Sequence, residues 1–149
     1  MCAGLAISRT RTALAHSISY PLTAELGLCH GLACSFTLPE LLECAGAAAP
    51  ERMGRVARAL GASSVAGAAR ELAALLAALG VRERLRAAIP DASTIAGCRG
   101  PFLTPERADH FPVRLAEADA RRLAARAWER LMAAPDRTQT RAPVLGGST

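Results

Sequence analysis

Apolar side chains recur every three or four positions over most of this chain, which is the period of an amphipathic helix. The clearest case is residues 65–79, which follow the helix-capping pair Ser63-Ser64 and end at Gly80. The last strong pattern covers residues 117–132, where we expect Trp128 to anchor helix packing. The full set of expected helices is 3–19, 30 to about 38, 40–44, 51–60, 65–79, 81–89 and 117–132.

Two stretches interrupt this pattern. We expect Pro21 to end the first helix, because proline lacks an N–H and clashes with the preceding turn, which leaves residues 23–28 as a connection. Residues 91–112 are rich in Gly, Pro, Thr and Arg, and we expect turns there with one short helix starting near Thr104. Residues 144–149 are expected to form a flexible tail, so the predicted domain covers residues 1–143.

Composition supports an all-α fold of one domain. The chain has 149 residues, 51% of them hydrophobic and only 3% aromatic, and the hydrophobic share is mostly alanine and leucine, which favour helices. This length buries a sizeable core, but it is too short for a catalytic domain together with a dinucleotide-binding domain. No G-x-G-x-x-G or P-loop motif occurs in the sequence.

Charge and cysteine content indicate a cytoplasmic protein that binds neither nucleic acid nor membrane. The net charge is +5, but all 18 basic residues are arginines, most of them spaced among alanines and acids as on solvated helix faces. No run of about 18 apolar residues predicts a membrane span. The five cysteines form no C-x-x-C pair, and no signal peptide precedes them, so we expect reduced thiols.

The candidate chemistry lies in two histidines, His16 and His30, fourteen residues apart. Imidazole is a common ligand of first-row metals, although a single histidine on an apolar helix is more often a core residue. Cys34 follows His30 by one helical turn, which permits a site of histidine and thiolate ligands as well as simple packing of the cysteine. The third histidine, His110, lies in the irregular stretch and is expected to be exposed, with Glu106 and Asp109 beside it as capping or surface charges.

The residues around the two histidines carry a resemblance to a known family. Ala-His16-Ser-Ile-Ser-Tyr20-Pro-Leu, followed by His30-Gly-Leu-Ala-Cys34-Ser-Phe-Thr-Leu-Pro-Glu, resembles the helical domain of iron-dependent (group III) alcohol dehydrogenases, which has a dehydroquinate synthase-like fold. The resemblance is strong over roughly residues 1–45, and weaker signatures continue to about residue 141. Tyr20 stands where many members carry another histidine, a pattern similar to the phosphonoacetaldehyde reductase branch.

This resemblance implies that His16 and His30 are two ligands of a divalent metal, Fe²⁺ or Zn²⁺, and that Tyr20 either contacts substrate or packs. Independently of the resemblance, Gly31 at the start of the helical segment after His30 is expected to allow a close backbone approach. The family's other two ligands belong to an Asp-x-x-x-His motif, which is absent from these residues. We expect that motif and the nucleotide-binding domain to lie upstream, so that this chain is a truncated, split or excised C-terminal half.

The implied function is an NAD(P)-dependent oxidoreductase that interconverts a primary alcohol and an aldehyde, with the metal polarising the substrate oxygen. Binding of NAD(P) would require a nucleotide-binding partner segment. The alternatives are a non-catalytic helical remnant or interaction module and, more remotely, an unrelated helical protein with a chance histidine pair. Because a half-enzyme exposes an apolar face around the histidine cleft, we expect the isolated chain to form homodimers or aggregates.

Overall fold

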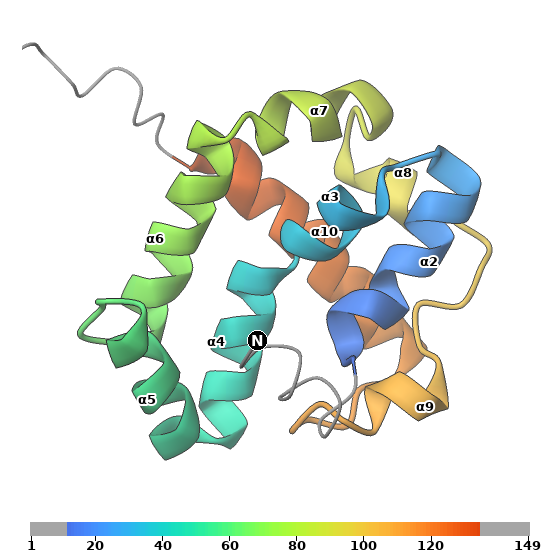
Figure 1. The fold of residues 1–149 in the computed structure, drawn as a ribbon. Helices are drawn as coiled ribbons and strands as arrows, with labels where there is room; N and C mark the ends of the chain where they lie inside the picture. Colours follow the sequence, from blue (N-terminus) through green and yellow to red (C-terminus); the bar gives the residue numbers. More distant parts are fainter. Residues whose placement is uncertain (1–11, 135–149) are drawn as a thin grey trace, which may run out of the picture.

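The computed structural model describes residues 12–134, and this range contains nine helices and no strand (Figure 1). This confirms the all-α fold class. Within that range no helix combines the length and the apolar character needed to cross a membrane. The helices are α2 (Leu14–Leu26), α3 (His30–Ser35), α4 (Leu38–Ala48), α5 (Pro50–Ala59), α6 (Val65–Ala78), α7 (Val81–Ala88), α8 (Ala92–Ala96), α9 (Pro105–Ala108) and α10 (Glu117–Ala133).

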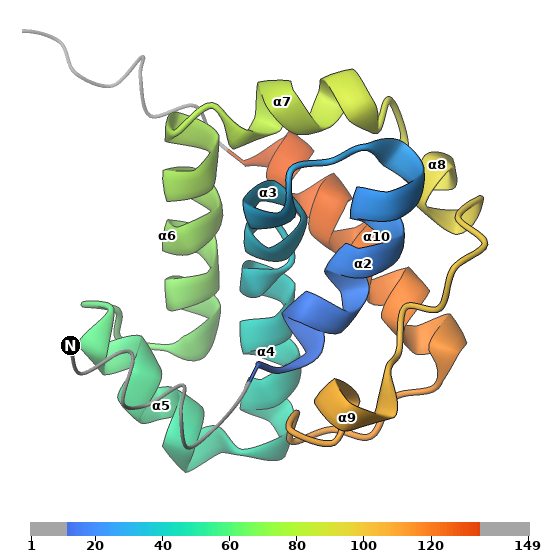
Figure 2. The same ribbon diagram turned by 45° about the vertical axis from the view of Figure 1, so that its right-hand side comes forward.

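Helix α10 is the element around which the others pack. It contacts α2, α4, α6 and α8, and it passes behind α2 in the view of Figure 2. One face of α10 is buried along its length, through Ala120, Leu123, Ala124, Ala127 and Leu131. The Trp128 indole N–H donates to the Ile89 carbonyl at 3.0 Å, which confirms the expected packing role of this residue. The core therefore lies between α10 and the helices that precede it.

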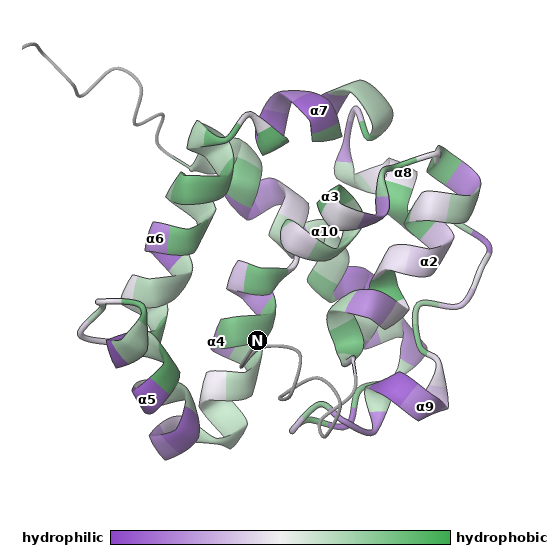
Figure 3. Cartoon of the chain, in the orientation of Figure 1, coloured by the Kyte–Doolittle hydropathy of each residue, from purple (hydrophilic) through white to green (hydrophobic). Residues whose placement is uncertain are grey.

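The predicted helix ends around α5 and α6 are confirmed. Ser64 accepts a hydrogen bond from the Gly67 N–H at 3.0 Å and so caps the start of α6. Gly61, after α5, has φ of +79°, and the next N–H, of Ala62, returns to the Ala57 carbonyl at 2.9 Å. This left-handed turn reverses the chain between two helices that pack together. Helix α6 is largely hydrophobic, whereas α5 and α7 carry hydrophilic stretches (Figure 3).

The expected break at Pro21 is wrong, and residues 23–26 are helical too. Helix α2 continues through Pro21 to Leu26; of the predicted helix 3–19, residues 3–11 lie outside the described range. Pro21 removes the N–H that would bond to the Ser17 carbonyl, which costs about 3 kcal/mol in a helix interior. Continuing the helix completes a buried stripe of Leu14, Ile18 and Leu22, all at most 1% exposed. Each such side chain contributes about 1.5–3 kcal/mol, so burial outweighs the proline penalty.

The irregular stretch from 91 to 112 is more ordered than the sequence predicted. The expected short helix near Thr104 is α9, but α8 was missed because five residues are too few to show a helical period. The Asp91 carboxylate caps α8 by accepting from the Thr94 N–H at 3.1 Å, and Ile95 is fully buried. The helix expected at 40–44 is also longer, since α4 runs from Leu38 to Ala48. The predicted tail, 144–149, lies outside the described residues.

Candidate metal centre

The turn between α2 and α3 brings the two predicted ligands together. Gly27, with φ of +65°, ends α2 in a left-handed conformation, and the chain then folds back so that α3 packs against α2. His16 lies in the first turn of α2, and His30 is the first residue of α3. Their ring centroids are 5.2 Å apart, with the planes inclined by 63°. Two histidines fourteen positions apart thus face one another.

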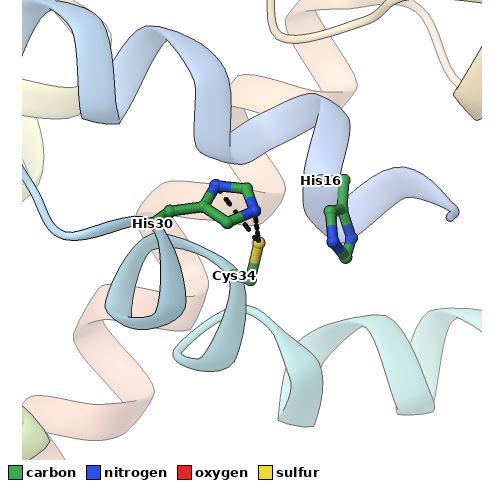
Figure 4. A group of neighbouring side chains, drawn as sticks. All are labelled: His16, His30 and Cys34. Atoms are coloured by element: carbon green, nitrogen blue, oxygen red, sulfur yellow. Dashed lines mark hydrogen bonds between the residues drawn. The ribbon is translucent and has the colours of Figure 1, made fainter.

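Cys34 joins this histidine pair. It lies one turn after His30 on α3, and its Sγ is 3.7 Å from Nε2 and 4.0 Å from Nδ1 of that ring (Figure 4). One ligand atom from each of His16, His30 and Cys34 lies within 4.8 Å of the others. Metal sites in proteins are built mainly from His, Cys, Asp and Glu side chains. Among the described residues, His16, His30 and Cys34 form the group of three such side chains whose ligand atoms are close enough to hold one ion.

Ser19 determines which nitrogen of His30 is free. Its hydroxyl is fully buried and donates to the His16 carbonyl at 2.8 Å. A serine hydroxyl has one proton, so the 3.2 Å contact between Ser19 Oγ and His30 Nδ1 requires Nδ1–H to be the donor. In the neutral ring, the Nε2 of His30 then carries the lone pair, and it is the nitrogen nearer to Cys34. This is the arrangement by which an outer partner orients a metal-binding imidazole.

The electrostatic surroundings favour a neutral His16. Burial lowers the pKa of His16, and the positive charges of His30 and Arg107 lower it further. A neutral ring is the form that coordinates a metal. Burial also raises the pKa of the Cys34 thiol. The donor set of two imidazoles and one thiol therefore fits a divalent cation that displaces the thiol proton.

Tyr20 and Arg107 border the same site. The Tyr20 ring stacks on that of His30 with centroids 6.4 Å apart and is 40% exposed, so it is not a core packing residue. The Arg107 guanidinium lies 4.6 Å from the centre of the Tyr20 ring. No carboxylate among the described residues pairs with Arg107. Sequence reasoning missed this arginine because it belongs to α9, almost ninety residues away along the chain.

A hollow of about 390 Å³ opens beside His16 and Cys34. It is lined by Thr12, Ala13, Ala15, His16, Gly31, Cys34, Ser35 and Leu38. A Cβ placed on Gly31 would meet nothing within 4 Å. Among the described residues, no other part of the chain therefore makes the close approach expected at this glycine. The glycine instead leaves the space next to His30 open. This hollow offers a small molecule access to His16 and Cys34.

His110 is not part of this cluster. It is exposed, as predicted, and it lines a groove of about 340 Å³ between the start of α2, α4, α5 and residues 110–112. This groove adjoins the hollow and shares Ala13, Ala15 and Leu38 with it. That groove is apolar in character, with Met53, Val56 and Leu60 among its walls. Glu106 and Asp109, the acids near His110, also lie outside the ligand cluster. Two of the three histidines therefore contribute to the candidate centre.

The chain is similar in sequence to known proteins. A curated relative, phosphonoacetaldehyde reductase from Streptomyces viridochromogenes, is 56% identical over 39 residues, which are 26% of this chain and 10% of that protein. The matched stretch is thus about a tenth of the length of that reductase. No solved structure matches the chain significantly. Residues 1–96 match the family described as Fe-containing alcohol dehydrogenase, C-terminal, and the chain therefore belongs to this family.

Proposed function

We propose that this chain is the metal-binding, C-terminal half of an NAD(P)-dependent alcohol dehydrogenase that interconverts a primary alcohol and an aldehyde. The observation that carries the proposal is the approach of His16 and His30 to a ring separation of 5.2 Å. Together with the family membership, this distance favours their role as two ligands of Fe²⁺ or Zn²⁺.

The reaction requires hydride transfer between the carbinol carbon and the nicotinamide ring. In the oxidative direction the alcohol loses a hydride to NAD(P)⁺ and a proton to solvent, and an aldehyde forms. His16 and His30 would hold a divalent ion, which would supply Lewis acidity toward the substrate oxygen. The chain's own contribution is to hold neutral imidazoles in fixed orientation, through burial of His16 and the Ser19 hydrogen bond to His30.

The surroundings of the site favour a small aldehyde with an anionic substituent. Tyr20 and Arg107 lie together at the edge of the centre, and Arg107 has no acidic partner among residues 12–134. A guanidinium in this position matches a carboxylate, phosphate or phosphonate group. The similar Streptomyces viridochromogenes protein is named as a reductase of phosphonoacetaldehyde, which carries such a group. We propose that Arg107 binds the anion and that the Tyr20 hydroxyl contacts the substrate.

The nicotinamide cofactor must be bound by a nucleotide-binding segment, in the same polypeptide or a separate one. These 149 residues contain no Gly-rich dinucleotide motif and no Asp-x-x-x-His. The second candidate function, a non-catalytic helical module that keeps the fold, is favoured by this incomplete ligand set. The two functions differ in whether a supplied nucleotide-binding segment restores turnover.

The decisive experiment fuses the whole chain behind the nucleotide-binding segment of the Streptomyces viridochromogenes reductase. NAD(P)H oxidation is followed with phosphonoacetaldehyde and with a neutral small aldehyde, after loading with Fe²⁺ or Zn²⁺. We expect turnover that is lost in His16→Ala and His30→Ala and retained in the matched control His110→Ala, whose ring lies outside the cluster. Arg107→Met should raise KM for the anionic aldehyde only.

A properly folded, metal-loaded fusion without turnover would contradict the proposal and favour the non-catalytic module. Equal activity of the three histidine variants would likewise overturn the ligand assignment. An equal rise in KM for both aldehydes in Arg107→Met would remove the anion-binding role alone.

A further inference from the structure

The three-residue cluster contains one more donor than the two histidines that the proposed function uses. Cys34 is half-buried on α3, and its Sγ faces the same ring nitrogen, Nε2 of His30, that the Ser19 contact leaves unprotonated. The geometry points to Cys34 as a third protein ligand, so that this chain alone binds Zn²⁺ through His16, His30 and a thiolate. The inference rests on the proposed function in taking the two histidines as ligands.

The distances are close to those of a zinc site. Zn–N bonds of about 2.0–2.1 Å and a Zn–S bond of about 2.3 Å at tetrahedral angles separate the two donor atoms by about 3.5 Å. The distance from Cys34 Sγ to His30 Nε2 is 3.7 Å. The three donors lie within 4.8 Å of one another, so zinc distances require a movement of about 1 Å, a displacement of the size that side-chain torsions allow.

The position of Cys34 in the helix also suits ligation. His30 and Cys34 are separated by one turn of α3, and side chains at i and i+4 lie on the same helical face. Both face the start of α2, where His16 lies (Figure 4). By contrast, Cys29 precedes His30 directly and is exposed, but it does not belong to the cluster. The chain therefore offers a matched control cysteine beside the same histidine.

A His₂Cys set changes which metal the site prefers. Thiolate is a soft ligand and favours zinc over hard, oxygen-preferring cations. Three protein ligands from this chain would leave coordination positions for further ligands, such as the pair expected upstream. The hollow lined by Gly31 and Ser35 borders His16 and Cys34. On binding, the metal would take the place of the thiol proton, which passes to the buffer, and no electron is transferred.

The test uses Co²⁺ as a spectroscopic probe on the purified full chain. We expect one equivalent to bind with a thiolate-to-cobalt charge-transfer band in the near ultraviolet and to be displaced by Zn²⁺. Cys34→Ser should remove the band and weaken Zn²⁺ binding by at least about tenfold, the minimum effect of losing even an outer partner. Cys29→Ser should leave both unchanged. In Cys34→His, which keeps three donors, binding should persist without the band.

The result that overturns the inference is a wild-type Co²⁺ complex without the thiolate band, or one whose band survives in Cys34→Ser. A wild-type Co²⁺ complex without the band is enough to reject the inference. The inference can therefore be rejected even if Cys34→Ser does not fold. If binding depends on His16 and His30 but not on Cys34, the inference fails and the proposed function stands. If the band depends on Cys34 but the fusion described above shows no turnover, the proposed function fails and the zinc site stands.

Discussion

Two groups of polar side chains in this fold differ in how completely they are paired. The first, the α4–α10 ion-pair cluster, consists of Glu40, Glu43, Arg126 and Arg130. Arg130 Nε lies 3.0 Å from Glu40 Oε2, and its terminal nitrogens bond to Glu43. Arg126 Nε lies 3.1 Å from Glu40 Oε1. The hydrogen bond to Glu43 raises the pKa of Arg130, despite the opposing effect of burial. In this cluster every charge meets an opposite charge.

The second group, the ligand cluster of His16, His30 and Cys34, brings donors together without an acid. Burial lowers the pKa of His16, and positive charge on His30 and on the nearby Arg107 lowers it further. The comparison indicates that the first group joins two helices, whereas the second keeps lone pairs available for a ligand.

Breaking the ion-pair cluster should have the largest effect on stability. Glu40 is 9% exposed, and Glu40→Gln leaves Arg126 without a carboxylate and Arg130 with Glu43 only. We expect the free energy of unfolding to fall by about 2–3 kcal/mol, less than for a fully buried pair because both arginines reach solvent. Urea titration measures this change. Glu51→Gln, an exposed acid in α5, is the control and should change stability little.

In the same Glu40→Gln protein, zinc affinity should be unchanged once the unfolded fraction is subtracted. A weakened zinc affinity in the folded variant would mean that the two clusters are coupled and that the comparison is wrong. Additivity is expected because the clusters share no residue.

Ser19→Ala should lower stability less than Glu40→Gln does. Unlike Glu40→Gln, it should also weaken zinc binding. It removes the acceptor that orients His30, so we expect Zn²⁺ affinity to fall by about tenfold, the lower end of the effect of outer partners on metal sites. Stability should fall by about 1 kcal/mol through the lost hydrogen bond to the His16 carbonyl. Calorimetric zinc titration and urea unfolding separate the two effects.

The matched control for Ser19 is Ser35→Ala, because the Ser35 hydroxyl also donates to a carbonyl three residues earlier, Leu32, but contacts neither ring. If both serine variants weaken zinc binding equally, the orientation of His30 does not depend on Ser19.

The smallest expected effect concerns Glu25, a paired acid outside both clusters. The N–H groups of Arg99 and Gly100, at 2.8 and 2.6 Å, hold its pKa below the ordinary value of 4.5. A lowered folded-state pKa stabilises the protein above the unfolded pKa, and this contribution is lost as pH falls through the folded value. Glu25→Gln should therefore lower the thermal midpoint slightly at pH 7.

Below the folded pKa of Glu25 the wild type and Glu25→Gln should unfold at the same temperature, as judged by circular dichroism. A difference that persists in acid would show that Glu25 acts through packing rather than through its charge.

The fold class and most helices could be predicted from the sequence, because caps such as Ser64 and turn glycines such as Gly61 act locally. Pro21 misled the prediction, since the buried stripe of Leu14, Ile18 and Leu22, which outweighs the proline penalty, depends on contacts with distant helices. The short helix α8 depends on a cap and one buried side chain, and neither produces a periodic pattern.

The candidate site was predicted only in part. His16, His30 and Tyr20 lie in one local motif, so the family resemblance identified them. Their functional roles remain predictions. The orientation given by Ser19 requires knowledge of its hydrogen bonds. Arg107 belongs to α9, and its approach to Tyr20 follows from the packing of α9 against α2, which spacing in the sequence does not reveal.

The most direct test of the central claim is the metal content of the full chain, purified without chelator and measured by elemental analysis. We predict about one equivalent of iron or zinc in the wild type, and little in His16→Ala or His30→Ala although both remain folded by circular dichroism. His110→Ala should keep the wild-type content. Equal metal content in all four proteins, or none in the wild type after incubation with Zn²⁺, would contradict the account.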